Sequence, residues 1–286
     1  MTVTPTSESL TTLSVDTLVI PLPHPVTSAD TDALTDAFGT SFVRALRNLG
    51  GEVGDAVVFY PEATEAEQVV LVHAGTIDAD DAEALRRGAA GAADAVRTAQ
   101  AATVGLVCPS LPASIQAGTQ ALVEGLALAH YRYTAYKTDV EEAAPPLDAV
   151  HVAYRSDHDA DAIADGAARA QHFVQATYSA RDLVNRSPHE KTARDLAAAI
   201  EASGDAHGYT VETWDREQIE DEGMGGLLAV NRGSVEPPTF SIMEWAPDHA
   251  VNSRPVVLVG KGVVFDTGGL SLKPTKDSMD CIKADM

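Results

Sequence analysis

The chain has 286 residues, 45% of them hydrophobic and 22% charged, which excludes a disordered protein and predicts about two globular domains. Its 42 acidic and 20 basic residues give a net charge of −22, so we expect no nucleic-acid partner, because such a field repels phosphates. No apolar run approaches the ~18 residues of a membrane span, and the N-terminus lacks the basic and apolar regions of a signal peptide. No membrane partner is therefore expected.

The first half of the chain alternates apolar runs with alanine-rich segments of helical spacing. Strands are predicted within residues 15–23, 55–62, 68–75, 102–110 and 148–155. Helices are predicted within residues 29–50, 78–100 and 112–136. Strands interleaved with helices indicate a three-layer α/β domain, which we place at residues 1–154.

A second series of the same kind follows a connecting helix at residues 155–175. Helices are predicted within residues 190–203 and 223–234, and strands within residues 209–215, 239–247 and 254–260. The fold class is therefore α/β, with two three-layer domains at residues 1–154 and 176–286. The two cysteines are too few for a disulfide framework, so a cytoplasmic protein is expected.

The last 28 residues, "VGKGVVFDTGGLSLKPTKDSMDCIKADM", hold four of the six lysines. Lys261 and Asp266 follow the predicted strand 254–260, and side chains at the C-terminal edge of such a strand lie where α/β folds bind ligands. The glycine pair after Asp266 permits a tight turn, and Lys273 and Asp285 come later. This spacing leaves two interpretations open. One is a salt-bridge network, and the other is a site for hard divalent cations, which lysine joins only when deprotonated.

Other common catalytic patterns are absent from the sequence. It has no G-x-x-x-x-G-K-[ST] phosphate loop, no G-x-S-x-G nucleophile elbow, no H-E-x-x-H and no cysteine pair for a thiolate metal site. We expect Cys281 to be a buried or half-buried structural thiol rather than a nucleophile. We expect Lys137 and Lys191 to be exposed.

The segments "VGKGVVFDTGGLSLKP" and "MDCIKADM" resemble the signature of the leucyl aminopeptidase (cytosol aminopeptidase) family of two-metal exopeptidases. Residues 179–185, "SARDLVN", and 223–238, "GMGGLLAVNRGSVEPP", are similar to further segments of that family in the expected order. The resemblance covers residues 175–286, whereas residues 1–154 share only α/β character and position. It implies a metal-dependent aminopeptidase that removes N-terminal residues, with a leucine-like preference, from peptides with a free N-terminus.

The same resemblance implies roles for particular residues. Lys261 would be a neutral amine ligand of one metal ion, Asp285 a second ligand of that ion, and Asp266 a carboxylate that bridges two ions. Lys273 would stay charged and polarise the scissile carbonyl. Ile282 falls near the pocket for the substrate's first side chain, and it either lines that pocket or belongs to the core.

The cofactors implied are two divalent ions, Mn²⁺ or Zn²⁺, with Mg²⁺ and Co²⁺ as alternatives, and the implied assembly is a homohexamer. The family completes its site with a later segment that carries an aspartate ligand, a glutamate ligand and an arginine. That segment is absent here, so we expect the catalytic domain to be incomplete at its C-terminal end and this chain to be inactive alone. The alternative is a non-catalytic binding or assembly protein that retains the aminopeptidase scaffold.

Overall fold

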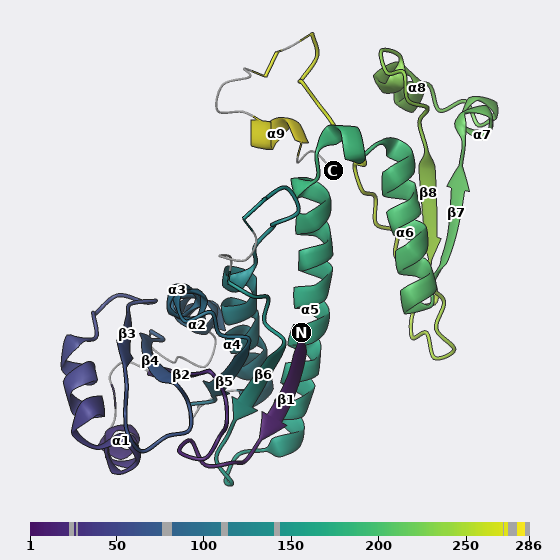
Figure 1. Ribbon diagram of the computed structural model, residues 1–286. Helices are drawn as coiled ribbons and strands as arrows, with labels where there is room; N and C mark the ends of the chain where they lie inside the picture. The colour runs from purple at the N-terminus through teal and green to yellow at the C-terminus, as the bar shows by residue number, and fades with distance from the viewer. Residues whose placement is uncertain are drawn as a thin grey trace. The chain divides into compact units, whose positions relative to one another are not determined.

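The computed structural model describes residues 1–22, 26, 28–75, 82–109, 114–139, 144–270, 272–273 and 279–283. The chain forms two compact units, Met1–Ser179 and Ala180–Met286 (Figure 1). The first contains a six-stranded, mostly parallel sheet and the second a two-stranded sheet, both packed with helices. The α/β fold class predicted from the sequence is thus confirmed.

The sheet of the first unit has the strand order β1-β6-β5-β2-β4-β3. All neighbours are parallel except β3 and β4. Every residue of β2 and of β4 is buried, as expected for parallel strands covered on both faces. The strands are β1 (Thr2–Thr6), β2 (Thr17–Leu22), β3 (Ala56–Phe59), β4 (Gln68–His73), β5 (Thr103–Val107) and β6 (Ala149–Ala153).

Helices cover both faces of this sheet (Figure 1). Strand β2 shows why, because successive side chains point to opposite faces. Ile20 packs in a cluster with Phe42 of α1, and Val19 packs in another with Leu122 of α4 and Ile163 of α5. The helices are α1 (Ser28–Asn48, kinked at Gly39), α2 (Ala82–Ala90), α3 (Ala93–Thr98), α4 (Ile115–His130) and α5 (Ala160–Asn185).

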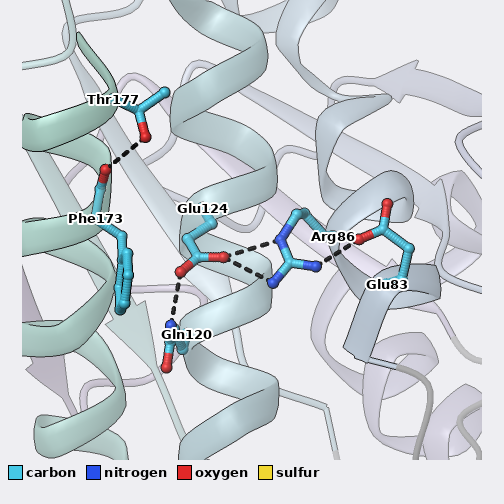
Figure 2. Close-up of polar contacts among 6 residues, drawn as sticks. All are labelled: Glu83, Arg86, Gln120, Glu124, Phe173 and Thr177. Carbon is cyan, nitrogen blue, oxygen red and sulfur yellow. Dashed lines mark hydrogen bonds and ion pairs between the residues drawn. The ribbon is translucent and has the colours of Figure 1, made fainter. Parts of the chain in front are cut away.

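A partly buried ion pair joins α2 to α4 (Figure 2). Arg86 donates from Nε to Glu124 Oε2 at 2.9 Å, and its Nη2 lies 2.8 Å from the same oxygen. Gln120 Nε2 donates to the other oxygen of Glu124 at 2.7 Å, while Glu83 pairs with Arg86 at the surface. The carboxylate of Glu124 is therefore satisfied although it lies between two packed helices, as a buried charge requires.

His130 ends α4 with a neutral, buried imidazole. Its side chain is 3% exposed, and Nε2 has no hydrogen-bond partner among the described residues. Burial, with the charges of Arg97 and Arg132, lowers the pKa of His130 to about 4. The unfolded chain binds a proton at this residue below its ordinary pKa of about 6.5, whereas the folded chain does so only near pH 4. Acid therefore favours the unfolded state over this window.

We expect the free energy of unfolding to fall by about 2 kcal/mol between pH 7 and pH 4.5 through this residue alone. Urea denaturation at both pH values, with the parent chain and a His130→Gln variant, measures the effect. The parent should lose about 2 kcal/mol more than the variant over this range. Parallel pH profiles of the two proteins would contradict the assignment.

The second unit begins within α5, which covers most of the segment predicted as a connecting helix and continues to Asn185. Strands β7 (Thr210–Trp214) and β8 (Phe240–Glu244) form its antiparallel sheet. A capping box between Thr192 and Asp195 starts the helix α6 that packs on these strands. The remaining elements are η2 (Pro188–Glu190), α6 (Ala193–His207), α7 (Arg216–Asp221), α8 (Gly225–Asn231) and α9 (Met279–Lys283).

The prediction of a strand at residues 254–260 is wrong, because this segment is irregular and exposed in the structure. Val256, Val257, Leu258 and Val259 are between 73% and 92% exposed. A strand requires a neighbour for its backbone N–H and C=O groups. Within the part of the chain that the structure describes, no strand pairs with these residues. An apolar sequence alone therefore did not suffice to form a strand here.

Candidate metal centre

Two lysines and one aspartate of the C-terminal segment converge. Lys261 Nζ lies 3.2 Å from Asp266 Oδ2, and Lys273 Nζ lies 3.7 Å from the same oxygen. The side chains are 54% exposed for Lys261, 30% for Asp266 and 27% for Lys273, so solvent and small ions reach the cluster. The structure thus brings together three of the side chains that the sequence selected, and it pairs both lysines with Asp266.

A tight turn after Asp266 holds its carboxylate in place. Gly268 donates its backbone N–H to Asp266 Oδ1 at 2.7 Å, and the Lys273 N–H closes the turn on Thr267 O at 2.8 Å. Gly268 and Gly269 have φ angles of 75° and 127°, which side chains with a Cβ rarely adopt. The "DTGG" sequence therefore fixes one oxygen of Asp266 by the backbone and leaves the other facing the lysines.

The short helix α9 contacts the same turn. The N–H of Asp266 donates to Ile282 O at 2.9 Å, and Lys273 Nζ donates to Cys281 O at 3.0 Å. The side chain of Ile282 is 3% exposed, and a role for it in a substrate pocket stays a prediction. Cys281 is an exposed free thiol, so the prediction of a buried or half-buried sulfur was wrong.

Asp285 lies outside the described residues, so its place relative to Lys261 and Asp266 stays a prediction. Within the described ranges, no three His, Cys, Asp or Glu side chains form a group that could hold a metal ion. The residues present fit a divalent cation in kind, since a carboxylate oxygen and an amine nitrogen lie side by side and are accessible. They do not fill its preferred set of about six ligands.

Lys191 was not singled out by the sequence, and the expectation that it is exposed was wrong. Its side chain is 0% exposed, and Nζ donates to Lys283 O, the last carbonyl of α9, at 2.9 Å. Burial, followed by the charge of Lys283, lowers the pKa of Lys191. Lys137 is exposed, as predicted. Nothing in the sequence distinguishes Lys191 from an exposed lysine, so its burial is seen only in the structure.

Comparison with known proteins decides the family. Residues 19–140 match the model of the cytosol aminopeptidase family, N-terminal domain, and residues 178–286 match the model of its catalytic domain. The chain belongs to the cytosol aminopeptidase family. The motifs that resemble this family all lie after residue 175. The match of residues 19–140 therefore extends the similarity to most of the chain.

Individual relatives agree with this assignment. A probable cytosol aminopeptidase from Syntrophotalea carbinolica is 36% identical over 82% of this chain and 48% of its own length. Another from Chloroherpeton thalassium is 33% identical over all of this chain and 59% of its own length. The chain thus spans about half to three-fifths of these relatives. No described helix is both long enough and apolar enough to cross a membrane.

Among solved structures, the bottromycin maturation enzyme BotP in complex with Mn has a TM-score of 0.70 and 29% sequence identity. The match covers 95% of this chain and 53% of BotP. A second structure of BotP gives the same TM-score at 27% identity. The α/β architecture of this cytosol aminopeptidase family chain is therefore shared with a related solved enzyme.

Proposed function

We propose that this chain is part of a metal-dependent aminopeptidase that releases N-terminal residues, leucine-like by preference, from peptides. The observation that carries the proposal is the convergence of Lys261 and Lys273 on Asp266 within a family of aminopeptidases. The BotP complex with Mn supports the use of a divalent metal by a related enzyme. We extend that chemistry to this chain, with Mn²⁺ or Zn²⁺ as the cofactor and Mg²⁺ or Co²⁺ as alternatives.

Each residue has a chemical task in this proposal. Lys261, Asp266 and Asp285 would hold two divalent ions, which when bound would supply Lewis-acid chemistry and lower the pKa of a water molecule. Asp266 contributes the oxygen that lies between the two lysines. Lys273 would keep its proton and place a positive charge beside the substrate carbonyl, where negative charge develops during hydrolysis.

The selectivity for a free N-terminus follows from the same arrangement. A free N-terminal amine is a ligand that an internal peptide bond cannot offer, so only the first residue of a peptide would bind productively. Ile282 is proposed to border the pocket for the side chain of that residue. A cytoplasmic homohexamer remains part of the proposal on family grounds.

The proposal is tested with leucine p-nitroanilide, using the natural protein purified from its source cells and the 286-residue chain separately. We expect Mn²⁺-dependent or Zn²⁺-dependent hydrolysis by the natural protein, and none of an N-acetylated substrate. We expect little or no hydrolysis by the 286-residue chain, because it carries only three of the implied ligand residues. No hydrolysis by the natural protein with any of the four metals would contradict the proposal and favour a non-catalytic binding or assembly protein.

A further inference from the structure

We propose that Lys191 is a positioning residue of the candidate metal centre, which it supports by anchoring the C-terminal end of α9. The part of this inference that concerns metal binding rests on the proposed function. Its structural part rests on contacts among described residues alone. Lys191 itself contacts neither Asp266 nor a substrate in this proposal, and it acts through the helix.

Helix α9 needs partners outside itself. A helix leaves its last four carbonyl groups without partners in its own backbone, and a helix of five residues is too short to be stable alone. Three external donors meet its last three carbonyls. Lys273 Nζ binds Cys281 O, the N–H of Asp266 binds Ile282 O, and Lys191 Nζ binds Lys283 O.

Two of these three donors belong to the candidate metal centre itself. Asp266 supplies the carboxylate between the lysines, and Lys273 supplies one of the two amines beside it. The position of α9 therefore constrains the Asp266 backbone and the Lys273 amine. Lys191 is the donor that comes from outside this loop, 92 residues before Lys283 in sequence. It ties the centre to a separate part of the second unit.

The backbone around Lys191 suits an anchor. Ser187 caps η2 just before it, and Thr192 with Asp195 forms the capping box of α6 just after it. Both elements fix the chain on either side, so the long side chain starts from a defined point. Complete burial of an amine is costly unless it is hydrogen-bonded, and the Lys283 carbonyl provides the acceptor. Positive charge near the C-terminal carbonyls of a helix is also favourable.

The test compares Lys191→Met and Lys191→Arg with Lys137→Met in the 286-residue chain. Lys137→Met is the matched control, because it makes the same change at an exposed lysine in the first unit. Hydrogen exchange of residues 266–270 and 279–283 reports on the anchor without any metal. Titration with Mn²⁺ by calorimetry and by the Mn²⁺ electron paramagnetic resonance signal reports on the centre.

We expect faster exchange in both segments and about tenfold weaker Mn²⁺ binding in Lys191→Met, the range typical for loss of an outer-shell partner. Lys191→Arg, which keeps the donors, should recover part of both effects, and Lys137→Met should match the parent. Exchange in Lys191→Met equal to the parent would overturn the anchor. Faster exchange with unchanged Mn²⁺ affinity would overturn the positioning role. Absence of Mn²⁺ binding by the parent would instead overturn the proposed metal centre. The hydrogen-exchange comparison would still test whether Lys191 anchors α9.

Discussion

Replacing Arg86 by methionine is expected to lower the free energy of unfolding by about 3 kcal/mol, the lower end of the cost of breaking a buried ion pair. The substitution keeps most of the aliphatic stem but leaves the Glu124 carboxylate, whose side chain is 8% exposed, without its cation. Gln120, which donates to the other oxygen of Glu124, and water would then solvate that charge. The lower end applies because the Arg86 side chain is 32% exposed, so water compensates part of the loss. Urea denaturation measures the change.

Two further variants separate the buried pair from the surface pair. The side chain of Glu83, the surface partner of Arg86, is 64% exposed. Glu83→Gln should therefore lower the free energy of unfolding by less than about 0.5 kcal/mol. The double variant Arg86→Met with Glu124→Leu removes both buried charges and should recover most of the loss, since apolar replacement of such a pair is often neutral. A cost in Glu83→Gln equal to that in Arg86→Met would show that burial is not the cause.

The interior strands of the first unit were predictable because a strand that is buried on both faces has an apolar sequence along its whole length. β2, β4 and β5 lie in the interior of the sheet, so their residues form continuous apolar runs. Strand β1 was missed for the opposite reason. It pairs only with β6 at the edge of the sheet, contains Pro5 and is largely exposed, so its sequence is polar.

The C-terminal segment shows the limit of local patterns. The apolar run at residues 254–260 predicts a strand, but strand formation depends on a neighbour that the run does not encode. Lys191 shows the same limit for a side chain. Its burial depends on the Lys283 carbonyl, 92 residues away, and no feature of "PHEKTA" indicates that acceptor.

The proximity of Lys261 and Asp266 was predictable because it is local. They are five residues apart, and the glycines after Asp266 permit the turn that orients its carboxylate. The sequence could not choose between a salt-bridge network and a cation site. Both interpretations require the same side chains at the same positions, and they differ only in whether a lysine proton or a metal ion lies beside Asp266.

Replacing Asp266 by alanine is expected to weaken Mn²⁺ binding by at least about 100-fold, because loss of an outer-shell partner alone costs roughly 10–100-fold. Two effects act together. The carboxylate that would hold the ions is lost, and the positive charge of Lys273, which faces Asp266 Oδ2 together with Lys261, is no longer offset by it. A divalent cation would then meet the charge of Lys273 without the carboxylate that offsets it. Calorimetric titration with Mn²⁺ measures the affinity.

A matched variant distinguishes a specific site from general attraction to an acidic protein. Asp248→Ala changes the net charge equally at an exposed aspartate of the same unit and should leave Mn²⁺ affinity unchanged. With a net charge of −22, weak binding of cations at many surface positions is expected, and it should respond equally to both variants. Equal Mn²⁺ affinity in Asp266→Ala and Asp248→Ala would therefore show that the cluster is a salt-bridge network. A selective loss in Asp266→Ala requires a site built on that one carboxylate.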